Sequence, residues 1–494
     1  MKKIIGLLIF SSLLLTTAHA QNEVDALRYS QTSFYGTARY MSMGGAFGAL
    51  GADFSTLSTN PAGIGLYKSS ELTFTPSISF SNIDATYNGS IREGTREKFN
   101  FTNLGLVMTQ DIMEKSKWKN FQFGIGMNRM HNFNNNYLIS GVNDQNSMAD
   151  VFARLANGTN FEVIEEDPYG DYAFDLNPAW WTFLIDTLGG PSSYVSTAPD
   201  GPIQQTKYIN NSGSMNEVVM AFGANYNDRL YIGASFGFPY IRYSSSSTYT
   251  ERKLNEDTDP AEFREFERTQ DLETRGTGFN FKLGIIARPV NWLRVGGSIQ
   301  TPTYYSSVTD EWQESYFTRF DTPDSQNNYS YYEESPLGTY DYDLKTPMRA
   351  SGSIGIIFGS AGLISADYEY VDYSNAKLSA PDYDFISEND AIQAKYTSTH
   401  NIRLGTEWRY GPFSIRGGYA IYGSPYSNNT NDGERNYYSF GLGYRERVFF
   451  ADLAWVHESS EEDYYLYGYE DISVNPTKLE SMTDLFMLTF GFRF

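Results

Sequence analysis

The chain has 494 residues, including 39 Tyr, 34 Phe and 43 Gly, and it contains no Cys. Without Cys, disulfides, thiolate metal sites and Cys nucleophiles are excluded. A net charge of −22 argues against a general nucleic-acid role, since phosphate binding requires a basic surface. A mean hydropathy of −0.44 argues against transmembrane helices, each of which needs about 20 apolar residues, and suits alternating strands with one wet face.

The first 20 residues have the organisation of a secretory signal peptide. Two lysines precede an apolar run at residues 4–10, and an A-x-A cleavage site ends at Ala20. We therefore expect export, with the mature chain beginning at Gln21. Because no later apolar segment is long enough for a spanning helix, the expected destination is the periplasm, the outer membrane or the medium.

A segment rich in small residues follows at 43–66. It contains a single acid, Asp53, and the sequence Asn60-Pro61-Ala62. Small residues allow close backbone packing, and Pro61 restricts Asn60 to an extended or turn conformation. This composition predicts a compact plug inside a larger structure. A phosphate-binding loop does not fit, because the glycine spacing is wrong, no strand precedes the segment and no Lys-Ser/Thr follows it.

From residue 70 onward, runs of about ten residues alternate between apolar and polar side chains, as in 230–238 and 279–285. Alternation of this length is typical of a strand with lipid on one side. The runs predict fourteen strands, an even number as single-chain bacterial barrels require. Short and long joints alternate, which places the short joints on the periplasmic side. The strands are expected near 70–82, 99–110, 118–131, 214–226, 229–245, 276–289, 292–308, 346–359, 362–376, 397–410, 412–424, 435–446, 448–460 and 482–494.

The last run has the clearest alternation. Large apolar residues occupy every second position from Phe486 to the final residue, including Phe490, Phe492 and Phe494. This pattern resembles the terminal strand that the outer-membrane assembly machinery recognises, so these three phenylalanines are the expected assembly signal. A soluble β-sandwich or barrel, the alternative fold, would rarely leave such a row on its closing strand.

The longest insertion spans about 132–213. Met148, Val151, Phe152 and Leu155 follow helical spacing and predict a short amphipathic helix. A second helix is expected at 178–185, stopped by two glycines at 189–190. It carries Trp180 and Trp181, which either form a first contact site for an apolar ligand or belong to the small core of the loop itself.

Residues 29–66, with Asp53 followed by Asn60-Pro61-Ala62, resemble the amino-terminal hatch of the FadL/TodX family of outer-membrane transporters of hydrophobic compounds. The strand pairs at 276–296 and 346–374 are also similar to this family. The resemblance implies an all-β transmembrane antiparallel barrel of about fourteen strands at 70–494, a hatch at 21–69 inside its lumen and short helices in a long outer loop. We expect a monomer in the outer membrane of a Gram-negative bacterium, assembled by the barrel-assembly machinery and surrounded by outer-membrane lipid.

The resemblance further implies uptake of hydrophobic small molecules such as long-chain fatty acids. Capture at the outer loops would be followed by transfer to an apolar pocket beside the hatch, and by escape through hatch movement or sideways into the membrane. Asn60, Pro61, Ala62 and Asp53 are carried over as structural and gating residues, and no metal or cofactor is implied. The alternative is a related barrel that acts as a partner subunit of a protein-secretion complex at the outer membrane.

No enzymatic activity is expected. Gly233 to Gly237 matches G-x-S-x-G, but the alternation continues without the strand-to-helix turn that a nucleophile elbow requires, so Ser235 is expected to face the lumen. A buried charge needs a partner, which favours ion pairs that hold the hatch. The alternative is that Arg403 or Arg416 contacts a ligand carboxylate. Strand parity directs seven charged residues inward: Lys282, Asp367, Glu369, Arg403, Glu407, Arg416 and Asp452.

Overall fold

The structure is a computed structural model that describes residues 22–112, 116–199, 201–254, 263–427, 431–469 and 472–494. The expected signal peptide at 1–20 and the expected mature start at Gln21 lie outside these residues. In the described part of the chain, no helix is long and apolar enough to cross a membrane.

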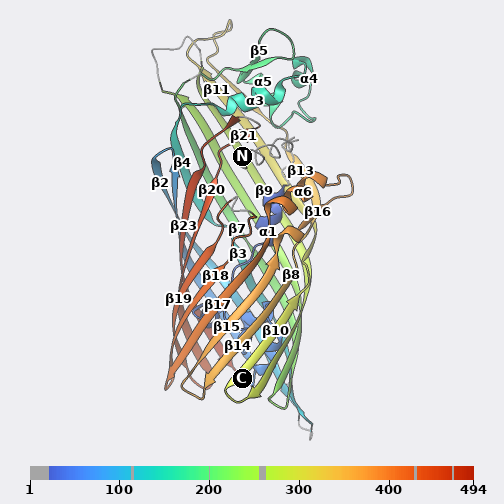
Figure 1. Cartoon of the computed structure of the whole chain (residues 1–494), viewed down its shortest axis with the longest axis vertical. Helices are drawn as coiled ribbons and strands as arrows, with labels where there is room; N and C mark the ends of the chain where they lie inside the picture. The colour runs from blue at the N-terminus through green and yellow to red at the C-terminus, as the bar shows by residue number, and fades with distance from the viewer. Residues whose placement is uncertain (1–21, 113–115, 200, 255–262, 428–430, 470–471) are drawn as a thin grey trace, which may run out of the picture.

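One antiparallel sheet closes on itself to form a barrel of fourteen strands, as expected from the sequence (Figure 1). The first strand pairs with the last, with Leu72 opposite Phe492. Four of the fourteen strands are interrupted and carry two labels each: β3 with β4, β10 with β11, β13 with β14, and β15 with β16. The bounds are β1 Glu71–Tyr87, β2 Ser90–Asp111, β3 Trp118–Asn132, β4 Asn135–Asn143, β7 Ile203–Tyr226, β8 Leu230–Lys253, β9 Phe263–Val290, β10 Leu293–Gln300, β11 Tyr304–Phe320, β13 Gly338–Lys345, β14 Arg349–Phe358, β15 Gly362–Asp372, β16 Lys377–Ser379, β17 Ser398–Tyr410, β18 Phe413–Tyr422, β19 Arg435–Arg445, β20 Phe449–Tyr464 and β23 Thr477–Arg493.

Several strands extend further from the short joints than the sequence predicted. The expected strands at 70–82 and 99–110 are β1 and β2, which form one continuous hairpin through a tight turn at Asn88-Gly89, and β9 begins at Phe263. Amphipathic alternation identifies a strand only where one face meets lipid. Beyond the membrane both faces meet water or protein, so the pattern disappears although the backbone pairing continues. The largest joint is correspondingly shorter than the predicted 132–213, because β4 and β7 occupy its ends.

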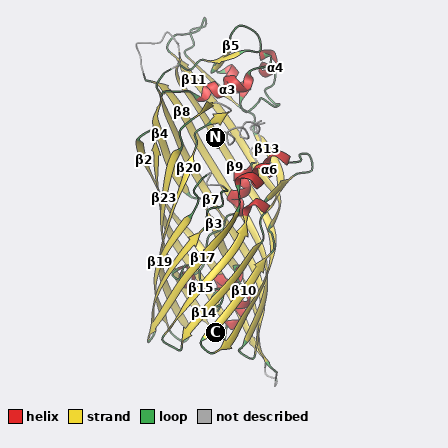
Figure 2. Cartoon of the chain, in the orientation of Figure 1, coloured by secondary structure: helices red, strands yellow, loops and turns green. Residues whose placement is uncertain are grey.

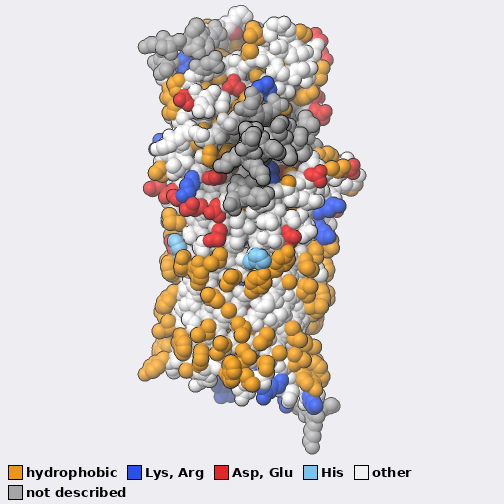
Figure 3. Space-filling model, viewed as in Figure 1, with side chains coloured by type: hydrophobic (Ala, Val, Ile, Leu, Met, Phe, Trp, Pro, Cys, Tyr) orange, Lys and Arg blue, Asp and Glu red, His pale blue; other side chains and the backbone are white. Residues whose placement is uncertain are grey.

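The outer wall of the barrel carries an apolar band. Figure 3 shows hydrophobic side chains covering the half of the cylinder near the carboxyl terminus, with acidic side chains beyond them. On β23, Phe486 and Phe492 are exposed while Leu485 and Met487 are buried, which is the alternation expected of a lipid-facing strand. The band and the closed sheet together meet the requirement that a spanning structure satisfy all of its backbone hydrogen bonds internally.

A cap of short elements packs against the long strands at the other end. It contains α3 Met148–Ala156, α4 Phe161–Glu165, α5 Leu176–Trp181 and the ribbon of β5 Ile185–Thr187 and β6 Tyr194–Ser196. The first predicted helix is confirmed. The second was predicted at 178–185 but ends at Trp181, because Phe183 adopts a positive φ of 55° and residues from Ile185 pair as a strand. The carboxylate of Glu251 on β8 accepts the backbone N–H of Met148 and ties the start of α3 to the wall.

The hatch fills the lumen with four short helical elements: α1 Glu23–Ser30, α2 Ala38–Met41, η1 Phe54–Ser58 and η2 Pro61–Leu66. Figure 2 shows these helices enclosed by strands. A further helix, α6 Ile386–Lys395, lies in the chain segment between β16 and β17. It packs against α1, and Lys395 forms an ion pair with Glu23 at 2.6 Å. The remaining elements are β12 Ser330–Glu334, η3 Tyr373–Asn375, β21 Gly468–Tyr469 and β22 Ile472–Ser473. The sequence analysis did not predict α1, α2 or α6.

The cap should become less stable as the pH rises. Burial raises the pKa of Asp175, at the start of α5, to about 6. A carboxyl group whose pKa is higher in the folded state stabilises the fold below its ordinary value near 4 and loses that contribution as the pH rises through 6. We expect a loss of about 1–3 kcal/mol in cap stability between pH 4 and pH 7, measured by thermal melting of the Trp emission. Asp175→Asn should abolish this dependence, and an unchanged pH profile in this variant would contradict the assignment.

Phe494 should matter for assembly but not for the stability of the assembled barrel. Its side chain is 71 % exposed on the outside, and its backbone N–H donates to the carbonyl of Ser70 at 3.1 Å, a bond that any residue can make. Phe494→Ala should therefore lower the yield of folded barrel in the membrane and leave its heat-resistant gel migration unchanged. Phe486→Ala, in the same lipid-facing row, serves as the control, and equal yields for the two variants would contradict a terminal signal.

Candidate functional site: the hatch and the lumen

The sequence-predicted hatch residues make the turns that fold the plug. Asp53 precedes η1, where its carboxylate accepts the N–H of Ser55 at 3.0 Å and the hydroxyl of Thr37 at 2.7 Å. Asn60 precedes η2, and its side-chain carbonyl oxygen accepts the N–H of Ala62 at 3.1 Å. Pro61 occupies the first helical position, where the missing N–H loses no helical hydrogen bond. The acid and the Asn-Pro-Ala sequence are thus two helix starts.

Asn60 also joins the hatch to the wall. Its side-chain amide donates to the carbonyl of Gly48 at 2.6 Å and to the carbonyl of Ile285 on β9 at 3.4 Å. The wall leaves room for this contact, because a Cβ at Gly284 would collide with the Asn60 side chain and one at Gly233 with the Pro61 carbonyl. Asn60 therefore bonds both the hatch backbone and a wall strand, as a structural role implies. Its gating role remains a proposal.

Buried ion pairs hold the middle of the hatch. Arg39 on α2 donates to Glu407 on β17 at 2.8 Å. Arg416, on the neighbouring β18, bonds the same carboxylate at 2.7 Å and Asp452 on β20 at 2.6 Å. The Arg416 side chain is 0 % exposed. This arrangement corresponds to the predicted network that holds the hatch, and its Arg416 does not line the polar cavity described next.

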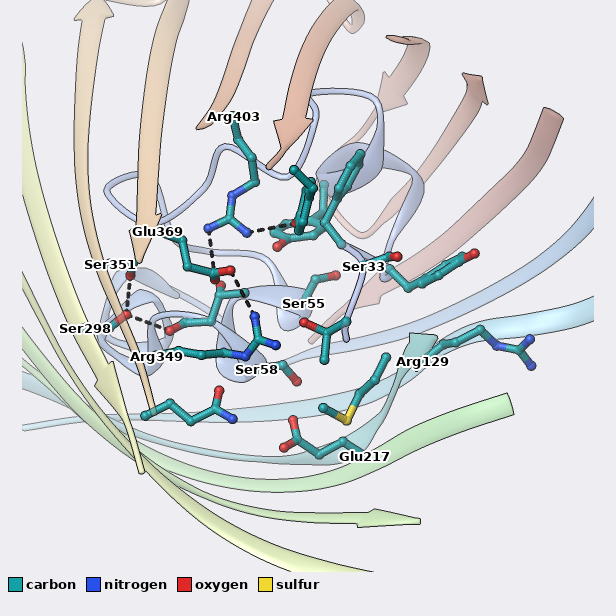
Figure 4. A pocket seen from close by; sticks show the side chains of 18 of the residues that line it. Ser33, Ser55, Ser58, Arg129, Glu217, Ser298, Arg349, Ser351, Glu369 and Arg403 are labelled. Carbon is teal, nitrogen blue, oxygen red and sulfur yellow. Dashed lines mark hydrogen bonds and ion pairs between the residues drawn. The ribbon is translucent and has the colours of Figure 1, made fainter. Parts of the chain in front are cut away.

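A polar cavity of about 60 Å³ lies in the lumen between the hatch and the wall. Figure 4 shows Arg403 and Arg349 approaching Glu369 from opposite sides. The distances are 3.1 Å from Arg349 and 3.6 Å from Arg403, whose second contact is the Tyr422 hydroxyl at 3.2 Å. Among the described residues, the Nε atom of Arg403 has no hydrogen-bond partner, nor has one oxygen of Glu217, whose other oxygen is bound by Lys282. The cavity has room for a few waters or a polar head group, and is too small for a long alkyl chain.

An aromatic cluster lies beyond the cavity, around α1. Tyr29 packs edge-on against Phe133 at 6.1 Å and Tyr243 at 6.2 Å between ring centroids, and Leu27 is buried in the same cluster. The amino-terminal helix therefore occupies an apolar part of the lumen. An apolar ligand of any length requires α1 to shift before it can enter this region.

The wall is not hydrogen-bonded throughout. Pairing between β2 and β3 ends at Asn103 opposite Asn128, where the two side chains bond at 2.8 Å. In the described part of the chain, β4 pairs beyond this point with β7 only, and β2 continues at 90–102 with β1 as its sole strand partner. The side chain of Arg96 on β2 donates across to the Asn135 carbonyl on β4 at 3.2 Å. We call this unpaired junction the β2–β4 seam. Arg129 and Met130, which follow Asn128 directly, line the polar cavity, so the seam begins next to it.

The structure separates the two tryptophans of the outer loop. Trp180 is partly buried in the cap and stacks on Phe161 with ring centroids 5.3 Å apart. Trp181 is 44 % exposed. Trp180 thus belongs to the loop core. Of the two tryptophans, Trp181 alone is exposed enough to make a first contact with a ligand. Ser235 faces the lumen in mid-strand, where its hydroxyl donates to the Leu57 carbonyl at 3.0 Å and anchors the hatch.

Sequence reasoning missed Arg39, Glu217 and the seam. Arg39 lies in a segment treated only as a Gly-rich plug, and its partner Glu407 is 368 residues away, so no spacing links them. Glu217 begins the predicted strand at 214–226, and parity relative to the apolar Val218 would have directed it inward. The seam depends on which strands fail to pair, a property that residue types do not encode locally.

Comparison with solved structures identifies this fold. No protein-family model and no curated protein matches the chain. A crystal structure of a Pseudomonas aeruginosa FadL homologue superposes with a TM-score of 0.53 and 12 % identity, over 93 % of this chain and 98 % of that chain. The Ralstonia pickettii toluene transporter TbuX gives a TM-score of 0.53 and 14 % identity, over 93 % and 99 %. The Pseudomonas putida toluene transporter TodX gives 0.50 and 10 %, over 94 % and 99 %. The fold is that of the FadL-type barrels, as the sequence resemblance suggested.

Asn60→Ala should loosen the hatch without disturbing the barrel. The change removes the bonds to Gly48, Ile285 and Ala62, and losing buried hydrogen bonds of this kind costs about 1–3 kcal/mol locally. We expect normal assembly and heat resistance, together with greater leakage of small polar solutes into cells. Asn475→Ala, at an exposed asparagine, is the control. Failure of Asn60→Ala to assemble would assign Asn60 to the fold and remove the gating role.

Arg39→Met should have a similar effect through a different bond. Glu407 keeps Arg416 and Arg409 as partners, so the wall retains its charge balance and only the hatch loses an anchor. We expect an increase in single-channel opening frequency in planar bilayers with unchanged heat resistance. Arg409→Met removes the exposed partner of the same carboxylate and should leave the channel closed. Equal opening frequencies of Arg39→Met and wild type would contradict the anchoring role.

Proposed function

We propose that this chain is an outer-membrane channel of a Gram-negative bacterium that takes up hydrophobic small molecules. The observation that carries the proposal is a hatch that fills a closed barrel and brings a buried aromatic cluster next to a polar cavity. An aqueous porin needs an open lumen, whereas this lumen contains a plug with apolar surroundings. The structural neighbours described as toluene transporters favour the same class of ligand.

The combination of an aromatic cluster and charged groups favours an amphipathic ligand, such as a long-chain fatty acid, over a pure hydrocarbon. The apolar chain would replace α1 among the aromatic rings, and the carboxylate would approach Arg403. Of the two arginines considered from the sequence, Arg403 is the better candidate, because it lines the cavity and Arg416 does not. Arg416 is fully buried between Glu407 and Asp452.

For the exit, the β2–β4 seam supports a sideways route. A ligand in the cavity lies beside the last pair of residues that joins β2 to β3. If it leaves the lumen through the seam beyond that pair, no backbone pairing between strands has to break. Hatch movement is needed first, since the hydroxyl of Thr102 on β2 donates to the hatch carbonyl of Gly36 at 2.8 Å next to the seam. In this scheme Asp53, Asn60, Pro61 and Ala62 hold the hatch closed between transport events.

Uptake by intact cells tests the proposal. Gram-negative host cells without their own outer-membrane route for long-chain fatty acids should accumulate labelled oleate faster when they carry this protein than when they carry the empty vector. Arg403→Met should slow oleate uptake several-fold but leave uptake of the methyl ester unchanged, because only the free acid presents a carboxylate. Arg275→Met, at an exposed arginine on β9, is the matched control.

Two outcomes would overturn parts of this scheme. Equal uptake with and without the protein across oleate, its methyl ester and toluene would contradict transport, and stable co-purification with a secretion complex would then favour the alternative of a secretion partner. Equal slowing of acid and ester by Arg403→Met would assign Arg403 to the lumen structure and not to the carboxylate.

A further inference from the structure

Basic residues gather at the end of the barrel where the short joints lie. The chain as a whole has 59 acidic and 37 basic residues, yet at these joints the described residues include nine Lys or Arg and four acids. We call this set the periplasmic rim. It comprises Lys68, Lys117, Lys119, Arg229, Arg288, Arg409, Arg445, Arg447 and Arg493, with Glu71, Asp111, Asp228 and Glu446 as the acids.

Most of these cations form no ion pair within the described part of the protein. Arg409, Arg445 and Arg493 form ion pairs with Glu407, Asp452 and Glu71, respectively. The other six form no ion pair with any described residue, although Arg229 and Arg288 donate to carbonyl groups of the β9–β10 joint. The six lie on five different joints. Four of these joints fall between the hatch and β10, and of the six cations Arg447 alone lies on the other half of the barrel, at the β19–β20 joint.

A belt of aromatic side chains lies directly above the rim on the lipid-facing wall. Neighbouring strands contribute stacked or tilted pairs, such as Phe358 with Trp408 at 5.7 Å and Phe449 with Phe492 at 5.4 Å between ring centroids. Trp292, at the β9–β10 joint, is 55 % exposed. Figure 3 shows Lys and Arg side chains just below the apolar band at this end. Aromatic belts mark the level of lipid head groups, so the rim lies at the head groups of the periplasmic leaflet.

We propose that the periplasmic rim binds the head groups of anionic phospholipids in the leaflet that surrounds it. Lys and Arg at a membrane surface attract anionic head groups over about one Debye length. The aromatic belt places these cations at the level of the lipid head groups, so the head groups of the surrounding leaflet are within their reach. The inference concerns the barrel and its bilayer, and it holds whichever compound passes through the lumen.

Competition between brominated lipids tests the proposal. The purified barrel is reconstituted in mixed vesicles of phosphatidylglycerol and phosphatidylcholine, with one of the two lipids brominated. Quenching of Trp118, Trp292 and Trp408, which lie at the rim, then reports which lipid is in contact. We expect phosphatidylglycerol to bind about fivefold more strongly than phosphatidylcholine per site beside a cation, and this preference to weaken at high salt.

A charge-neutral variant separates the rim from other effects. The fourfold variant K68Q/K117Q/R229Q/R447Q should bring the ratio of the two binding constants close to one, while heat-resistant migration shows that the barrel is folded. The control K377Q/R252Q/R264Q/R275Q removes four exposed cations from the outer end and should keep the wild-type ratio. If the fourfold variant does not fold, K68Q/K117Q should give an intermediate ratio.

Several results would overturn the proposal. A ratio of one in the wild type, or an equal ratio in wild type and rim variant, would exclude selective binding of anionic lipid. A ratio of one together with salt-sensitive capture of the barrel by an immobilised acidic protein would assign the rim to protein docking. None of these results depends on ligand uptake, so failure here and failure of the proposed transport function are distinguishable.

Discussion

The structure depends on one constraint, that a backbone surrounded by hydrocarbon must satisfy its hydrogen bonds within the protein. Fourteen strands meet it by closure, with Leu72 on β1 opposite Phe492 on β23. The β2–β4 seam is the exception, and β2 at 90–102 lacks a partner along one edge. Irregular backbone at membrane depth is tolerated where it is covered by protein or lines a cavity. The position of the seam beside the polar cavity is consistent with that rule and connects the lumen with the wall.

The same constraint applies to the hatch, which cannot rely on bulk water. Its short helices begin at side chains that accept the first free N–H groups, including Asn22, Thr37, Asp53 and Asn60. Its irregular turns approach the wall at strand glycines such as Gly233 and Gly284. A segment of small residues and helix caps is therefore what a packed lumen requires. This explains why the plug could be recognised from composition before any strand was counted.

Sequence reasoning succeeded where chemistry is periodic. Lipid on one face imposes alternation, so the number of strands and the inward direction of Arg403, Glu407 and Arg416 followed from parity. It failed where chemistry stops being periodic, as in the outer half of β9 and the hairpin turn at Asn88-Gly89, because neither face meets lipid there. The ion pair of Arg39 was inaccessible for another reason: its geometry is set by barrel closure, which brings together residues 368 positions apart.

The charge network also explains how a tightly held hatch can move. Breaking a buried ion pair by removing one partner costs about 3–5 kcal/mol when the remaining charge is left uncompensated. Here the wall compensates its own charges: Glu407 keeps Arg416 and Arg409, and Glu369 keeps Arg349 and Arg403, when hatch groups withdraw. The hatch contributes additional bonds to a lattice that is already balanced. Its release therefore leaves Glu407 and Glu369 paired on the wall. The cost falls on Arg39, which loses Glu407, and on Asp367, whose carboxylate loses the hatch N–H of Gly48 at 2.8 Å.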